Sequence, residues 1–163
     1  MKVTERIVRI AGLVCALSGL FAGPAADQAV PFRGQASGQD VSVTFAATGI
    51  HIVAQASGNG TGLGRFVETL DYILSYDLVN FSGSATITSA DGSGMSLSFQ
   101  GQIPGFSDQV FPLPYSGTFV LTGGTGRFHG VSGSGTLEGI DYGGGLFSLG
   151  FSGSRTVGVQ KIE

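Results

Sequence analysis

Two carboxylates lie three positions apart in a segment with the alternating pattern of a strand. Glu68 shares one side of this segment with Leu70, and Asp71 lies on the other side. If the side of Glu68 faces inward, its carboxyl group points toward a cavity, where burial would raise its pKa and suit it to acid or base chemistry. A carboxylate at the rim, paired with Arg65 or Arg127, is the more ordinary placement of a charged residue. Glu68 is therefore a weak catalytic candidate, and both alternatives stay open.

Histidine and serine offer no comparable chemistry. His51 and His129 are the two histidines, and neither has a second ligand residue at a metal-binding spacing, so we predict no metal site. Ser134 lies between two glycines in a strand-like segment, without the strand-to-helix context of a hydrolase nucleophile. We predict no cofactor.

A glycine run at positions 123–126 invites comparison with a dinucleotide-binding turn. The third glycine of that motif would fall at position 129, which is His129, and more glycines follow where a helix should begin. The run also lacks the Asp of a calcium-binding repeat. It is instead typical of a turn between two strands, and the turn carries Arg127 and Phe128.

The elements that must position these residues are strands. Apolar and polar residues alternate with a period of two, and turn signals such as Asp91-Gly92 separate the runs. The expected strands cover 31–38, 41–45, 50–55, 66–76, 81–87, 95–100, 118–122, 132–139 and 146–156, with a glycine loop at 58–64. Consecutive short strands at this spacing predict an all-β fold, a single antiparallel barrel of about eight strands with essentially no helix after residue 25.

A weak internal repeat accompanies the turns. The stretch 60–66 is similar to 123–128, and both end in Arg-Phe. Because each phenylalanine follows a turn that brings the backbone close to the core, we predict that Phe66 and Phe128 pack as equivalent plugs beneath the two turns.

The segment 103–115 breaks the rhythm of the strands. It contains three prolines and two phenylalanines, which is typical of a long apolar loop that forms a lid, a binding edge or a subunit contact. Together with the apolar sides of the strands, this loop supplies the residues predicted to bind a ligand in the cavity or lid: Leu70, Tyr72, Leu97, Phe99, Phe106, Phe111, Phe119, Phe147 and Leu149.

The first 25 residues differ from the rest. Lys2, Arg6 and Arg9 precede a short apolar run that ends in small residues, the order of a secretory signal peptide. We therefore predict a signal peptide at 1–25, a β-barrel domain at 26–163 and a secreted product, extracellular or periplasmic, with no transmembrane anchor once the signal is removed. Cys15 lies in the predicted signal, so the mature chain has no cysteine for a disulfide.

The charge of the mature chain excludes some partners. Beyond residue 25 there are five basic residues against ten acidic ones, a net charge of −5. Without a basic stripe, nucleic acid and anionic lipid are not expected partners.

The glycine-turn pattern also carries a family resemblance. The stretch 117–136, preceded by 62–66 and by Asp91-Gly92, resembles bacterial secreted proteins with an allene oxide cyclase-like barrel. It is more distantly similar to plant dirigent proteins, which carry a comparable Gly-Gly-Thr-Gly-Arg-Phe turn. The resemblance covers about residues 32–157 and implies an eight-stranded calycin-type barrel. It also implies binding or orientation of a hydrophobic small molecule and a homo-oligomer.

Three functions follow as hypotheses. The favoured one is a secreted, non-enzymatic module that binds a small apolar ligand or a partner. The second is a cyclase-like or isomerase-like enzyme that shapes an apolar substrate in the barrel, although the absence of a cysteine in the mature chain argues against the cyclase reaction itself. The third is a structural secreted or envelope protein whose barrel is filled by its own side chains.

Overall fold

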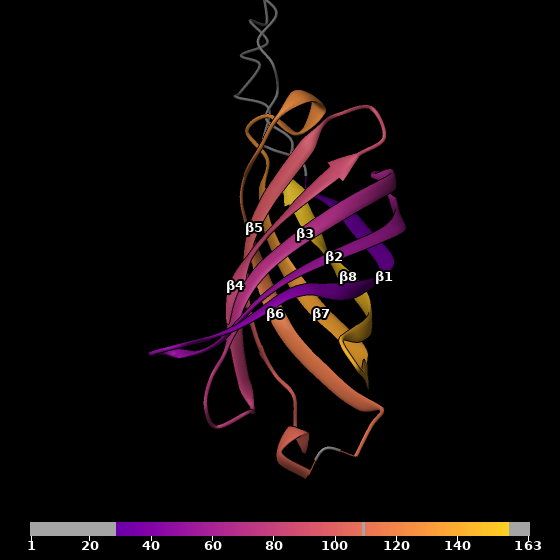
Figure 1. The fold of residues 1–163 in the computed structure, drawn as a ribbon. Coiled ribbons are helices and arrows are strands. Elements are labelled where there is room, and N and C mark those ends of the chain that lie inside the picture. The colour runs from indigo at the N-terminus through magenta and orange to yellow at the C-terminus, as the bar shows by residue number, and fades with distance from the viewer. Residues whose placement is uncertain (1–28, 109, 157–163) are drawn as a thin grey trace, which may run out of the picture.

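The protein is a closed antiparallel β-barrel. The structure, a computed structural model, describes residues 29–108 and 110–156. Each strand pairs with the next in the sequence and the last pairs with the first, so the sheet closes on itself (Figure 1). This confirms the predicted fold. The elements are β1 (Ala29–Ala46), β2 (Gly49–Thr61), β3 (Gly64–Leu74), β4 (Asn80–Ser89), β5 (Gly94–Gln102), the 3₁₀ helix η1 (Phe106–Asp108), β6 (Leu113–Gly124), the 3₁₀ helix η2 (Gly126–Phe128), β7 (Ser132–Gly143) and β8 (Leu146–Thr156).

The predicted alternation separates the interior of the barrel from its surface. In β3, Phe66, Leu70 and Leu74 are buried, whereas Val67 and Thr69 between them are exposed. Within the described ranges, no helix has the length and apolar character needed to cross a bilayer.

Inward-facing glycines make room for the aromatic core. The ring centroid of Phe32 lies 5.8 Å from that of Phe119 and 5.9 Å from that of Phe151. A Cβ atom on Gly34 would lie 2.4 Å from Cζ of Phe151, and one on Gly135 would lie 2.5 Å from Cζ of Phe119. Because a close-packed core has no room for such overlaps, a larger residue at either position would displace a ring.

Two predicted boundaries are wrong. The segments 31–38 and 41–45 form one strand, β1, with a bulge between Asp40 and Ser42. The glycine loop expected at 58–64 is mostly strand, because β2 continues to Thr61 and the turn is short. The glycines serve strand pairing here: a Cβ atom on Gly58 would lie 2.0 Å from the backbone oxygen of Gln35 on β1.

One end of the barrel is closed by η2, and we call it the closed end. Phe128 in η2 is buried, and the guanidinium carbons of Arg127 and Arg155 lie 4.8 Å and 5.0 Å from its ring centroid. Arg127 donates a hydrogen bond from Nη2 to the oxygen of Leu63 at 2.8 Å, and its Nε lies 3.3 Å from Oδ2 of Asp91. Arg127 therefore joins the connection between β6 and β7 to the β2–β3 and β4–β5 turns.

The two Arg-Phe turns differ in structure. Phe66 is buried as predicted, but it lies in β3 with its ring centroid 5.8 Å from that of Phe151. Phe128 lies in a 3₁₀ helix instead. The two rings are therefore both part of the core without being equivalent plugs, because the second glycine run forms a longer connection than the first.

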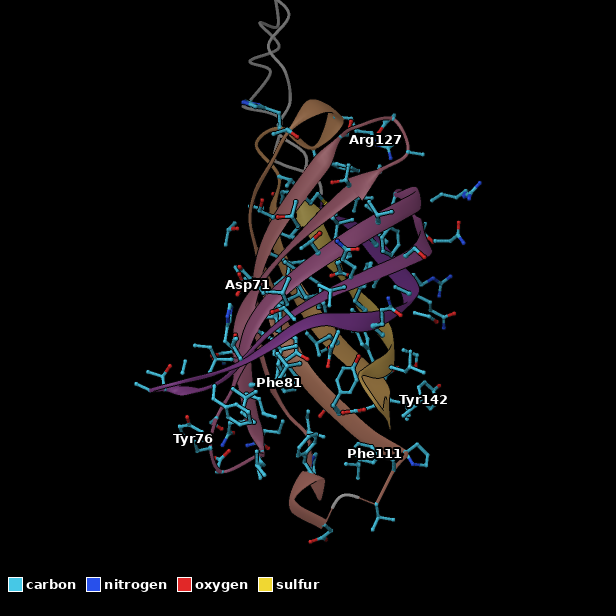
Figure 2. All side chains as sticks on the ribbon, viewed as in Figure 1. Asp71, Tyr76, Phe81, Phe111, Arg127 and Tyr142 are labelled. Carbon is cyan, nitrogen blue, oxygen red and sulfur yellow. The ribbon has the colours of Figure 1, made fainter. Side chains whose placement is uncertain are left out.

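We call the opposite end the mouth. Figure 2 shows Arg127 at the closed end, and Tyr76, Phe111 and Tyr142 toward the mouth. The predicted irregular segment lies there and ends earlier than expected, since Leu113 already belongs to β6. It contains η1 and a cis peptide bond between Phe111 and Pro112.

Phe128→Ala should lower the free energy of unfolding by about 3–5 kcal/mol, the range for truncating a buried phenylalanine. The ring is 1% exposed and lies against two guanidinium groups, so its removal would leave a cavity and two unsupported cations. Phe45→Ala is the matched control, because that ring is 79% exposed and its loss should change stability by less than about 0.5 kcal/mol. Urea unfolding measures the stability of both variants, and equal losses would show that the Phe128 ring is not buried in the core.

Candidate functional site

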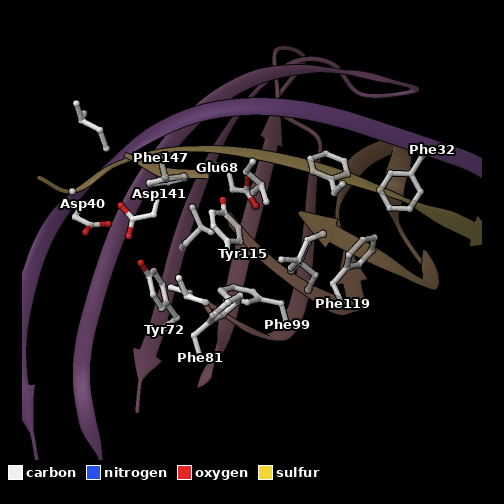
Figure 3. A pocket seen from close by; sticks show the side chains of 18 residues that line it. Phe32, Asp40, Glu68, Tyr72, Phe81, Phe99, Tyr115, Phe119, Asp141 and Phe147 are labelled. Atoms are coloured by element: carbon white, nitrogen blue, oxygen red, sulfur yellow. The ribbon is translucent and has the colours of Figure 1, made fainter. Parts of the chain in front are cut away.

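A cavity of about 80 Å³ lies inside the barrel and opens toward the mouth. Its wall is mainly apolar and aromatic (Figure 3). Eight residues singled out from the sequence line it: Glu68, Leu70, Tyr72, Leu97, Phe99, Phe119, Phe147 and Leu149. Ten further residues that line the cavity were not predicted: Phe32, Asp40, Phe81, Ile103, Tyr115, Leu137, Asp141, Gly145, Leu146 and Phe151.

Two residues from the predicted set lie outside the cavity wall. Phe106 is partly buried against the core, and Phe111 is 37% exposed. Their ring centroids are 6.0 Å apart with the rings perpendicular, so they pack on each other within the β5–β6 loop. Ile103 is the residue of this loop that reaches the cavity. A lid formed by Phe106 and Phe111 stays a prediction.

Glu68 is the most deeply buried carboxylate of the site. Its side of β3 is the inner side, and the residue is 3% exposed, so the rim placement beside Arg65 or Arg127 is wrong. Its Oε2 atom is buried and has no hydrogen-bond partner among the described residues. Burial favours the neutral acid and raises the pKa of Glu68 from 4.5 to about 7. Near neutral pH this carboxyl group can therefore both donate and accept a proton.

Two further carboxylates lie near the mouth. Asp40 and Asp141 each stand at a β-bulge, one in β1 and one in β7, and bulges commonly redirect side chains. Figure 3 shows their carboxyl groups directed toward one another. Burial, and secondly the charge of Asp141, raise the pKa of Asp40 to about 6. Asp40 Oδ1 is a second buried oxygen without a hydrogen-bond partner in the described part of the chain.

The backbone fixes the positions of both aspartates. The N–H of Asp40 donates to the oxygen of Gly145 at 2.8 Å, which ties the β1 bulge to the β7–β8 turn. The N–H of Gly143 donates to Oδ1 of Asp141 at 2.8 Å. Main-chain contacts therefore hold the backbone of Asp40 and the carboxylate of Asp141.

Two tyrosines complete the polar part of the wall. Tyr115 packs over Gly139, where a Cβ atom would lie 2.3 Å from the tyrosine ring, and its hydroxyl donates to the oxygen of Ser148 at 2.7 Å. Burial, and then the nearby charge of Glu68, raise the pKa of Tyr115. Burial, and then Asp40, raise the pKa of Tyr72. Both hydroxyls therefore remain protonated and can act as hydrogen-bond donors.

The other candidate groups lie away from the cavity. His51 contacts Asp71 at 2.7 Å between Nε2 and Oδ1, with both side chains well exposed. His129 is exposed and follows η2, and Ser134 lies in β7. The glycine run at 123–126 leads into the single 3₁₀ turn η2 and then into β7, without the α-helix that a dinucleotide-binding turn requires, which excludes that interpretation. Within residues 29–108 and 110–156, no three histidine, cysteine or acidic residues are grouped to hold a metal ion.

Comparison with known proteins supports the fold. No protein-family model matches the chain, and no curated protein sequence matches it. Among solved structures, the chain is similar to a pterocarpan synthase dirigent protein, with a TM-score of 0.56 and 12% sequence identity. The match covers 83% of this chain and 88% of that protein. The barrel is therefore dirigent-like, and the allene oxide cyclase and calycin parts of the resemblance stay predictions.

Glu68→Gln should change the dependence of stability on pH. Between about 4.5 and about 7, the folded protein keeps the Glu68 proton while the unfolded chain loses it, so the free energy of unfolding falls as the pH rises. Glutamine cannot ionise, so the variant should lack this contribution. We expect the variant to gain up to about 3 kcal/mol relative to the wild type between pH 4.5 and pH 8.

Urea unfolding at several pH values measures this difference, and other titrating groups contribute equally to both proteins. Glu138→Gln is the control, because Glu138 is exposed on β7, and its curve should follow the wild type. Parallel pH curves for Glu68→Gln and the wild type would show that the carboxyl group is not buried in the folded protein.

Proposed function

We propose that this protein is a secreted barrel that binds a small, mainly apolar molecule in its cavity without converting it. The observation that carries the proposal is the pair of buried carboxyl oxygens, Asp40 Oδ1 and Glu68 Oε2, at a cavity whose wall is otherwise mostly apolar. A buried polar atom without a partner costs about 1–3 kcal/mol. A ligand with a hydrogen-bond donor would recover part of that cost, and the apolar wall would bind the rest of the ligand.

The cavity volume limits the ligand. At about 80 Å³ the cavity is far smaller than the roughly 300–1,000 Å³ of drug-sized sites. The ligand is therefore small, or part of it extends through the mouth, where Leu146 is about half exposed.

The leader and the comparison add support. The charged and apolar order of residues 1–25 favours export, although this segment lies outside the described residues. The structural neighbour is named as a pterocarpan synthase dirigent protein, so a barrel of this shape is associated with small-molecule chemistry in that protein. The shared fold alone does not transfer that chemistry to this chain.

A cyclase-like or isomerase-like enzyme is the second candidate, and Glu68 is the observation that favours it. A buried carboxyl group with a pKa of about 7 suits proton transfer near neutral pH. For an enzyme, Glu68→Gln should abolish turnover of a bound substrate while binding persists, as measured by product analysis beside a binding titration. Turnover retained in the variant would remove Glu68 from the catalytic role.

A purely structural barrel is disfavoured by the same orphan oxygens. A barrel filled only for stability would place apolar residues at positions 40 and 68, because unpaired buried carboxyl groups lower stability. Retaining them is the pattern expected of a binding site.

Leu149→Trp should abolish uptake of a hydrophobic dye and of any small molecule that copurifies from the native host. Leu149 is 7% exposed and lines the cavity, so an indole there would occupy the ligand volume. Fluorescence titration and native mass spectrometry measure uptake, and a melting curve shows that the barrel still folds.

Val120→Trp is the matched control for Leu149→Trp. Val120 is 53% exposed on β6, so the added indole lies outside the barrel and uptake should persist. Equal uptake by the wild type and a folded Leu149→Trp variant would show that the dye binds elsewhere.

A further inference from the structure

The cavity combines acidic groups with aromatic walls, and no basic side chain lines it among the described residues. Its titratable residues are Asp40 from β1, Glu68 and Tyr72 from β3, Tyr115 from β6 and Asp141 from β7. The lining residues contributed by β4, β5 and β8 are apolar, and none of the lining residues is lysine, arginine or histidine. Tyr142 on β7 is the remaining titratable neighbour of Tyr115. An anionic ligand would therefore meet like charges throughout this cavity.

The three carboxyl groups occupy two separate positions along the cavity. Asp40 and Asp141 face one another near the mouth, and Glu68 lies deeper, beside the Tyr115 hydroxyl (Figure 3). Glu68 is 3% exposed, and its Oε2 atom has no partner among the described residues. The unpartnered oxygen inside the cavity is independent of the aspartate pair and points to a ligand that carries a strong hydrogen-bond donor.

Charged residues are also distributed unevenly between the two ends of the barrel. The arginines of the described chain are Arg33, Arg65, Arg127 and Arg155, and all lie in the half nearer the closed end, as the strand register shows. The mouth half has no lysine or arginine among the described residues, and its acidic residues include Asp40, Asp71, Asp77, Asp108 and Asp141. Asp91 lies at the closed end, where it pairs with Arg127. Such a division attracts cations to the mouth and repels anions from it.

We propose that the cavity prefers a primary amine with a short apolar body, an inference that rests on the ligand-binding function proposed above. Its ammonium group is held between Asp40 and Asp141 near the mouth, whose carboxyl groups accept hydrogen bonds from it, and the deeper carboxyl group of Glu68 adds negative charge to the same cavity (Figure 3). Its carbon chain packs on the phenylalanines and leucines of the wall, and the nearby aromatic faces favour the positive charge.

Binding of an amine should displace protons from the site. The raised pKa values, about 6 for Asp40 and about 7 for Glu68, mean that the empty site holds protons on these groups in mildly acidic solution. An alkylammonium stays charged across this range, as lysine does with a pKa of about 10.4. Amine affinity should therefore rise as the pH increases from 5.5 to 8, whereas a neutral alcohol gains nothing from ionisation of the carboxyl groups.

The test compares n-butylamine with 1-butanol, which have nearly equal size and differ in charge. Methyl-resolved nuclear magnetic resonance titrations of the mature protein at pH 5.5 and pH 8 follow the signals of Leu97 and Leu149, which line the cavity. At pH 8 we expect the amine to bind about tenfold more tightly than the alcohol. At pH 5.5 this preference should shrink several-fold.

Two variants and a control locate the ammonium group. Asp141→Asn should reduce amine affinity at pH 8 by about tenfold and Glu68→Gln, which removes the deeper charge, by about threefold, while both leave alcohol affinity within about twofold. Asp71→Asn changes a carboxylate that contacts His51 outside the cavity, and it should affect neither ligand. Melting curves verify that each variant folds, and the wild-type comparison stands without them.

The outcomes separate this inference from the function on which it rests. Alcohol binding as tight as amine binding at pH 8, or an amine preference unchanged by both cavity variants, overturns the amine inference and leaves small-molecule binding intact. Hydrophobic dye uptake without binding of either probe has the same meaning. Absence of dye uptake together with absence of probe binding overturns both proposals.

Discussion

The pairing of β1 with β8 is the contact on which the interior depends. It closes the sheet, and each inward side chain then faces other side chains instead of solvent. The mature chain that we expect has no cysteine, so closure of the hydrogen-bonded ladder and burial must provide its stability. β1 meets β2 on one edge and β8 on the other, and its bulge at Asp40 lies where this double pairing reaches the mouth. The same strand thus closes the barrel and supplies one carboxylate of the cavity.

Aromatic rings paired with glycines determine the shape of the cavity. Large rings on one strand need a partner position without a side chain, as Phe151 has in Gly34 and Tyr115 has in Gly139. The pair of Phe151 and Gly34 lies in the half nearer the closed end, and the pair of Tyr115 and Gly139 lies nearer the mouth. At the mouth the wall also includes Asp40, Asp141 and the glycine turn that precedes Leu146. The remaining space therefore lies next to the polar groups.

Much of the fold followed from alternation, and the site followed less completely. The pattern from Phe66 to Leu74 puts Glu68 on one side with Leu70, but the choice between an inward and a rim carboxylate stayed open until the structure showed that side buried. Asp40 could have been found by continuing the alternation from Phe32, but the intervening inward positions are small residues that carry no hydrophobic signal. Asp141 is similar, because the inward residue before it is Gly139. Bulges and the pairing of distant strands bring these aspartates together, and neither is encoded in a local period.

The closed end contributes contacts that stabilise the barrel, whereas the mouth leads to the proposed binding cavity. At the closed end, Arg127 and Arg155 lie against Phe128, and Arg127 satisfies a backbone oxygen and a carboxylate of neighbouring turns. In the cavity, by contrast, Asp40 near the mouth and Glu68 deeper inside each have a buried oxygen without a partner among the described residues, at a cost that a chain selected for stability alone would avoid. Arg127 joins three connections at the closed end, whereas no such contact spans the aspartates at the mouth in the described part of the chain. Because η2 lies over the other end, the ligand that we propose would enter at the mouth.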